Sequence, residues 1–146
     1  MLDCLKFRKE LKKLTAAKVK ALEFYSDKIK KVRQETKSHD EIQEILHTEM
    51  FEVGIIQEEI DMLITSHLRA KANHLLVPIP ECDDENMWTE CNKISRQKVL
   101  TTRGINSLKS AIRKEKKERL ELPITLAMLL IGIIGAITGL IAISKS

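Results

Sequence analysis

The feature that most constrains this chain is an uninterrupted apolar run near its C-terminal end. Residues 122–143 number 22 and include no charged side chain. As an α-helix the run is about 33 Å long, which matches the hydrocarbon core of a bilayer. A buried core helix normally keeps a polar stripe, and a chain of 146 residues is too small to cover such a helix on every side. We therefore predict a single C-terminal transmembrane helix.

The charges that flank this run predict its orientation. Five cations precede the run, whereas only Lys145 follows it. An excess of cations marks the cytoplasmic side of a span, and acidic residues count little in that rule. At the N-terminus, basic residues come before any apolar stretch, so we expect no signal peptide. Residues 1–121 should then be cytoplasmic, with 144–146 across the membrane.

The same cations stand where a helix leaves the bilayer, so we expect them to contact anionic lipid headgroups. Each cation near a charged membrane surface contributes about 1 kcal/mol. Membrane lipid is thus the first predicted partner. The predicted lipid contacts are Arg113, Lys114, Lys116, Lys117 and Arg119.

Composition predicts an all-α fold for the rest of the chain. Only 3% of the residues are aromatic and only five are glycine, against 32% charged. Such a composition argues against a β-sandwich and against a doubly wound sheet. The three cysteines have no short spacing, so we expect free thiols in a reducing compartment.

Two long amphipathic helices account for residues 1–76. In the first, at about 2–36, apolar residues recur every three or four positions, with one wider step past Lys18. Ser38 and Glu41 match a capping box, which starts a second helix at about 39–76. We expect an antiparallel, coiled-coil-like hairpin of roughly 50 Å. The apolar positions are Phe7, Leu11, Leu14, Leu22, Tyr25, Ile29 and Val32, then Ile42, Leu46, Val53, Ile56, Ile60 and Leu63, flanked by Ile45, Met50, Ile55 and Ile64.

Charge comes in blocks that support this pairing. Residues 1–37 carry a net charge of +7, residues 38–92 carry −11, and residues 93–121 carry +7. Surface ion pairs contribute only about 0.2 to 1 kcal/mol each, against roughly 1.5 to 3 for a buried Leu or Ile. Apolar burial should therefore hold the hairpin together, and charge should select its register.

Pro78 and Pro80 end the second helix and define a connector at 77–83. The region 84–121 then holds a short helix and a basic juxtamembrane helix. Acidic residues at 83–85 suit the start of the short helix, because anions favour the positive end of a helix dipole. Its expected inner face comprises Met87, Trp88, Cys91 and Ile94.

The basic helix begins near Thr101 or Thr102, either of which can serve as its N-cap. Ile105, Leu108 and Ile112 line one of its faces, and no breaker occurs before Pro123. A proline at the start of a span is tolerated or kinks it slightly. This helix should therefore continue into the transmembrane span at 122–143.

Residues 71–142 resemble a group of small bacterial membrane proteins that have a coiled-coil head and no assigned activity. The resemblance rests on KANHLLVPIP at 71–80, LTTRGINSLKSAIRKEKKER at 100–119 and LIGIIGAITGLIA at 130–142. It implies a bacterial inner-membrane protein with a single pass. It carries over no functional residue.

Small residues form a stripe along the predicted span. Close backbone contact between membrane helices requires small side chains, and residues 135–139 form a GxxxG motif. The alternative is that these glycines arise by chance, since glycine is common in such helices. We predict a homo-oligomer, formed through this stripe and through the coiled-coil helices. The predicted contacts are Gly132, Gly135, Gly139 and Ala142.

The sequence lacks the motifs of familiar catalytic and nucleotide sites. It has no GxGxxG, Walker, GxSxG or HExxH pattern. Glu44 and His47 fit one Glu-x-x-His element of a di-iron bundle, but such a site needs a second copy, and none is present. We therefore expect no enzymatic activity, no metal and no cofactor.

Three functions fit these features. The first is a membrane-anchored interaction or scaffold protein that recruits an unidentified protein partner. The second is a membrane-perturbing effector, similar to a toxin or a holin. The third is a membrane-tethered regulator that binds nucleic acid through the basic first helix. Against the third, the block of −11 beside that helix cancels much of its field, and no aromatic stacking platform accompanies the lysines. The same lysines could instead contact lipid.

Overall fold

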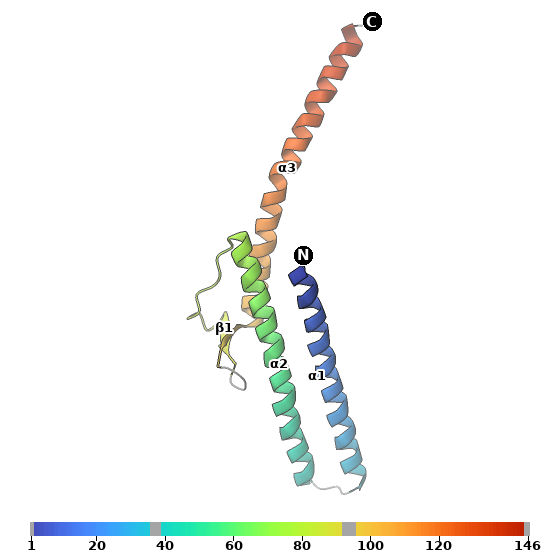
Figure 1. The fold of residues 1–146 in the computed structure, drawn as a ribbon, viewed down its shortest axis with the longest axis vertical. Coiled ribbons are helices and arrows are strands. Elements are labelled where there is room, and N and C mark those ends of the chain that lie inside the picture. The colour runs from blue at the N-terminus through green and yellow to red at the C-terminus, as the bar shows by residue number, and fades with distance from the viewer. Residues whose placement is uncertain (1, 36–38, 92–95, 145–146) are drawn as a thin grey trace.

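The computed structural model describes residues 2–35, 39–91 and 96–144, with all their side chains except those of 2–3, 122 and 136–144. The elements are α1 (Leu2–Glu35), α2 (His39–Leu75), β1 (Trp88–Glu90), β2 (Lys98–Leu100) and α3 (Thr102–Ser144). α1 and α2 lie side by side in opposite directions, and α3 starts beside the C-terminal half of α2 and then projects away (Figure 1). The predicted packed pair of long helices is confirmed. The predicted capping box at Ser38 lies outside the described residues.

The half of the α1–α2 hairpin next to the connection between the two helices has a small apolar core, formed by Tyr25, Val32 and Ile45. The prediction gave Leu46 a core position, but Leu46 is 36% exposed and Ile45 only 5%. Ile45 therefore belongs to the face of α2 that packs on α1, together with the partly buried Ile42. Glu52 follows Ile45 by seven residues and so shares its helix face, and it interacts with Tyr25 of α1.

Hydrogen bonds between polar side chains connect α1 and α2 at Lys18, where the spacing of apolar residues in α1 has its wider step. Lys18 Nζ donates to Gln57 Oε1 at 2.7 Å, and Gln57 Nε2 donates to Asp61 Oδ1 at 2.8 Å. Burial raises the pKa of Asp61, and Lys18 partly offsets this rise. Sliding one helix past the other would leave these half-buried groups unpaired, so these hydrogen bonds help to set the register of α1 against α2.

α2 ends in a Schellman motif whose left-handed residue is a leucine. Leu76 has a φ of 59°. The Val77 amide donates to the Ala72 carbonyl oxygen at 2.9 Å, and the Leu76 amide donates to Asn73 O at 3.1 Å. Ala72 and Val77 are both buried, which supplies the hydrophobic contact typical of this motif. Pro78 then prevents the helix from continuing, as predicted.

The prediction of a short helix after residue 84 is wrong, because β1 and β2 form an antiparallel hairpin there with Trp88 opposite Leu100. Asp84 Oδ1 accepts from the Asn86 amide at 2.9 Å, so the acidic cluster forms a local turn instead of starting a helix. Beyond it, the Leu100 amide donates to the Thr65 hydroxyl of α2 at 3.0 Å. Trp88 and Cys91 are buried as predicted. Ile94 lies outside the described residues.

The main core lies where α2, the β-hairpin and the first turns of α3 meet. Its buried residues include Ala72, Trp88, Leu100, Leu108 and Ile112. Gly104 lets α3 approach this hairpin, because a Cβ there would overlap the Met87 carbonyl oxygen and lie 3.0 Å from Leu100 Cδ2. We call this region the hub. It joins the N-terminal hairpin to the projecting part of α3.

α3 runs from the hub to residue 144 as one helix. Thr101 is its N-cap, since the Thr101 hydroxyl accepts from the Gly104 amide at 3.1 Å. Pro123 lies inside the helix, so the continuation predicted past this residue is observed. Among the helix residues that the structure describes, no stretch is both long enough and apolar enough to cross a membrane.

Candidate functional site: a cation-lined cavity between three helices

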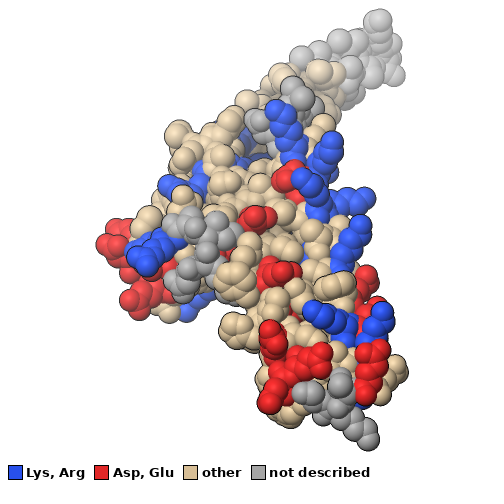
Figure 2. Space-filling view, turned by 60° about the horizontal axis from the view of Figure 1, so that its bottom comes forward, with Lys and Arg blue, Asp and Glu red and all other residues tan. Residues whose placement is uncertain are grey.

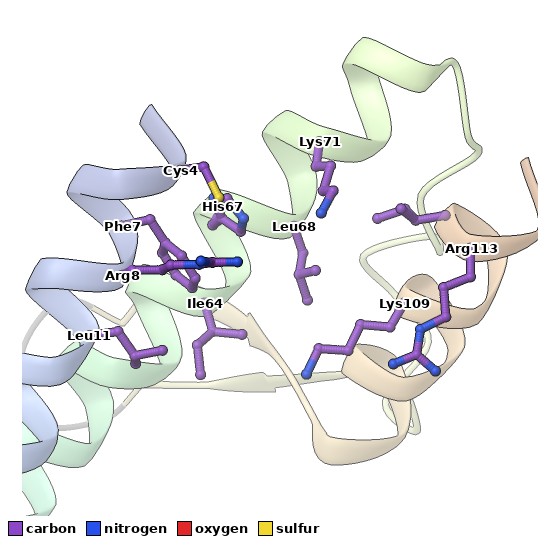
Figure 3. Close-up of a pocket in the computed structure, with 11 residues that line it drawn as sticks. Cys4, Phe7, Arg8, Leu11, Ile64, His67, Leu68, Lys71, Lys109 and Arg113 are labelled. Atoms are coloured by element: carbon purple, nitrogen blue, oxygen red, sulfur yellow. The ribbon is translucent and has the colours of Figure 1, made fainter. Parts of the chain in front are cut away.

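A cavity of about 340 Å³ opens where the N-terminal turns of α1 face the last turns of α2 and the start of α3. Four cations line it: Arg8 from α1, Lys71 from α2, and Lys109 and Arg113 from α3. Arg8 and Lys109 point toward each other across the space, and Lys71 points into it from α2 (Figure 3). The helical hairpin and the hub thus bring together charges that are far apart in the sequence.

The remaining wall of the cavity is apolar and aromatic. Phe7 stacks on His67, with ring centroids 3.8 Å apart and an interplanar angle of 7°. Burial lowers the pKa of His67, and the charge of Lys71 lowers it further. The apolar side chains of the wall are Leu11, Ile64, Leu68 and Ile112.

No carboxylate lines the cavity among the side chains that the structure describes. The chain segments 62–80 and 101–114 contain no Asp or Glu, and in α1 only Glu10 falls between the lining residues Cys4 and Leu11. Figure 2 shows Lys and Arg in a row along one edge of the molecule, and Asp and Glu in one group at the lower end of the view, beside some Lys and Arg, and in another group on the opposite edge. The described lining of the cavity therefore carries positive charge and no negative charge.

The five cations predicted to contact lipid do not form one cluster. Arg113 lines the cavity. Lys114 lies 4.0 Å from Glu118, and Lys117 lies 3.6 Å from Glu121. Arg119 is bound on two sides, because its Nε donates to Glu115 Oε1 at 2.7 Å and its Nη2 donates to the Leu75 carbonyl oxygen at 2.8 Å. Lys116 is exposed on the same helix.

The small-residue stripe lies on the projecting part of α3. Gly132 and Gly135 are exposed, and a Cβ added at either would meet no heavy atom within 4 Å. Gly139 and Ala142 also belong to α3, but their surroundings lie outside the described part of the structure. The stripe is therefore separate from the hub and from the cavity.

Comparison of the chain with protein-family models, with curated proteins and with solved structures finds no match. Within the described ranges, no three His, Cys, Asp or Glu side chains are grouped so as to hold a metal ion.

Sequence reasoning missed the cavity, although one signal pointed to it. Arg8, Lys71 and Lys109 belong to three separate charge blocks of the sequence, so no local pattern groups them. The absence of acidic residues from 62–80, inside a block of net charge −11, separates the end of α2 from its acidic remainder. That local reversal of charge marks the end of α2 that meets the basic ends of α1 and α3.

Proposed function

We propose that the protein is a non-enzymatic, membrane-anchored interaction protein, in which α3 connects a cytoplasmic helical head to a bilayer. The head comprises the α1–α2 hairpin and the hub. The anchor is the uncharged run at 122–143. In this arrangement the head is presented to partners at a set distance from the membrane.

The observation that carries the proposal is the exposure of the projecting half of α3. Every side chain from 123 to 135 is exposed. The large residues there are all apolar and lie on every side of the helix, with Ile124 53%, Met128 69% and Ile131 69% exposed. Water disfavours an apolar surface of this extent, whereas lipid tails solvate it. The sequence continues without a charge to residue 143, which supports a bilayer as the solvent.

Carbonate extraction of membranes from cells that express the full chain tests the anchor. We expect the chain to stay in the membrane pellet. The double variant Leu129→Lys with Ile133→Lys should lose this attachment, because each lysine near the centre of a span costs about 2.5 to 3.5 kcal/mol. The control Leu5→Lys with Val19→Lys changes two exposed apolar residues of α1 and should stay in the pellet. Extraction of the parent chain by carbonate would refute the anchor.

Alkaline-phosphatase fusions in a bacterial host test the orientation. The cations before the run support a fusion after Ser146 that is active and a fusion after Arg119 that is inactive. The reverse pattern would refute a cytoplasmic head. Loss of membrane potential on expression would instead favour a membrane-perturbing effector over an interaction protein.

A second copy of the chain is the proposed partner within the membrane. Gly132 and Gly135 present backbone without a side chain on exposed turns of α3, and the sequence extends this spacing to Gly139 and Ala142. Changing Gly135 and Gly139 together to Ile should weaken crosslinking between copies in membranes. The matched control, Ile134→Leu with Ile137→Leu, keeps the glycines and should crosslink like the parent. Equal crosslinking of all three proteins would show that the stripe of small residues contacts lipid and not a second copy of the chain.

A further inference from the structure

The cation-lined cavity has the composition of a binding site for an amphiphilic anion. Its cations come from three helices, so only the folded head brings them together. Bringing like charges together opposes folding, and no described acidic side chain at the cavity compensates for it. A bound anion would remove this repulsion and would stabilise the folded head by mass action.

The chemistry of the cations favours a phosphate group. Arg8 and Arg113 carry planar guanidinium groups, whose paired donors match the oxygens of a phosphate, and Lys71 and Lys109 add compact point charges. A phosphate monoester carries nearly two negative charges at neutral pH, so it is better matched to four cations than a single carboxylate is.

The rest of the wall favours an apolar group on the same ligand. Phe7, Leu11 and Ile64 line one side of the cavity, and the Phe7 ring already stacks on His67. A cavity of about 340 Å³ is near the lower end of the usual range for small-molecule sites, roughly 300 to 1,000 Å³. It therefore has room for a phosphate with a short apolar or aromatic segment.

We propose that this cavity binds the phosphate of an amphiphilic phosphate ester, with the apolar part of the ligand against Phe7, Leu11 and Ile64. The ester has two sources, a soluble organic phosphate or the headgroup of an anionic phospholipid. All the residues of the site lie between 4 and 113. The inference therefore does not rest on the proposed membrane span.

Cysteine alkylation reports occupancy without any mutation. Cys4 lines the cavity, Cys82 is exposed elsewhere, and Cys91 is buried. We measure the rates at which N-ethylmaleimide modifies Cys4 and Cys82 in the full chain in nonionic detergent, while phenyl phosphate is titrated. Cys4 modification should slow at least about fivefold at saturation, because the ligand blocks access, and Cys82 should be unaffected. Sodium chloride at equal ionic strength should give no such protection.

Matched variants distinguish binding by the cations of the cavity from a general attraction of anions to the positive charge of α3. Lys109→Gln with Arg113→Gln removes two cavity cations and should raise the half-protecting concentration of phenyl phosphate at least about tenfold. Lys116→Gln with Lys117→Gln removes the same charge from α3 outside the cavity and should change it by less than about twofold. Equal weakening by both pairs, or equal protection by sodium chloride, would overturn the proposal.

Two further probes identify the ligand. Inorganic phosphate should protect Cys4 less well than phenyl phosphate, and equal protection would overturn the apolar part of the proposal. Vesicles of equal parts phosphatidic acid, whose headgroup is a phosphate monoester, and phosphatidylcholine, compared with phosphatidylcholine alone, test the lipid source. Protection by phosphatidic acid but not by phenyl phosphate assigns the site to a lipid headgroup, and protection by phenyl phosphate assigns it to a soluble ester. Protection of Cys4 by neither would overturn the site.

The titration of His67 gives an independent readout. Lys71 follows His67 by one helical turn and its charge lowers the pKa of the ring, while Arg8 from α1 and Lys109 and Arg113 from α3 line the same cavity. A bound phosphate offsets these charges, so the pKa of His67, followed by NMR, should rise when phenyl phosphate is added. An unchanged His67 titration at a concentration of phenyl phosphate that protects Cys4 would place the ligand outside the cavity and overturn the proposal.

Discussion

Arg119 of α3 donates from Nη2 to the carbonyl oxygen of Leu75, the last residue of α2, at 2.8 Å. The last carbonyls of a helix have no partner within the helix, and a cation there also favours the negative end of the dipole. A residue that the sequence marks as a lipid contact thus ties α3 to the end of α2.

The first prediction concerns this tie. Arg119→Ala should lower the free energy of unfolding by about 1 to 2 kcal/mol, because it leaves a helix-end carbonyl without its charged donor. Denaturant unfolding in nonionic detergent measures this change through the fluorescence of Trp88, the single tryptophan, which is buried in the hub. Lys116→Ala, on the exposed side of the same helix, serves as the control and should leave the unfolding curve unchanged. Equal stability of the two variants would show that the bond to Leu75 contributes nothing.

The second prediction compares two glycines of α3. Gly104→Ala should destabilise the hub by about 1 to 3 kcal/mol, since the new Cβ overlaps the Met87 carbonyl oxygen and the hairpin must shift. Gly132→Ala meets no atom within 4 Å and gains helix propensity, so it should not destabilise the protein. The melting temperatures of the two variants, each compared with that of the parent, test this prediction. A Gly104→Ala protein as stable as the parent would contradict the close approach of α3 to β1.

The third prediction concerns the left-handed backbone at Leu76. This side chain is 86% exposed, so it contributes little packing that would offset its unfavourable φ. Leu76→Gly should raise the free energy of unfolding by about 0.5 to 1 kcal/mol, because glycine adopts positive φ at no steric cost. Leu76→Val should lower it, because β-branching worsens the left-handed conformation. The opposite order of the two variants in urea unfolding would argue against the Schellman motif.

The fourth prediction concerns pH and Asp61. Burial raises the pKa of this carboxyl above its usual 3.8, so the folded chain binds the proton more tightly than the unfolded chain does. The resulting stabilisation is fully present below the unfolded pKa and is lost as pH rises through the folded pKa. Asp61→Asn should therefore be more stable than the parent at pH 7, and the difference should shrink toward pH 4.

The variant Lys18→Met sharpens this test. Lys18 lowers the pKa of Asp61, so removing the lysine should move the pH range of the stability change upward. Unfolding curves at several pH values, for the parent and the variants, measure the effect. A stability difference between parent and Asp61→Asn that is constant from pH 4 to 7 would show that Asp61 does not titrate between folded and unfolded states in this range.

The N-terminal hairpin was predictable because its signal is local. Apolar residues repeat with the helix period over more than thirty positions in each helix, and Pro78 marks the end of α2. Even the gap in the pattern at Lys18 has a structural meaning, since this residue bonds to Gln57. Periodicity alone could not choose between Ile45 and Leu46, because that choice depends on how α2 is rotated against α1.

The β-hairpin was not predictable in the same way. Each strand has three residues, which is too short for an alternating pattern to be recognised. Its stability comes from distant partners, including Thr65 of α2, which binds the Leu100 amide. The cavity could not be predicted from the sequence for a related reason. Arg8, Lys71 and Lys109 meet only once the hairpin register and the hub have placed three helices together.

The continuity of α3 has a mechanical consequence. Lys109 and Arg113 lie on the same unbroken helix as the exposed apolar turns at 124–135. A helix transmits torsion along its axis, so a twist applied to its distal half acts on these two side chains relative to Arg8 and Lys71, which α1 and α2 hold. Each residue inserted into a helix rotates the later residues by about 100° relative to the earlier ones. One alanine added after Glu121 would therefore rotate the cavity by about 100° around the helix axis relative to the distal half of α3. Every contact within α1, α2 and the hub would stay intact.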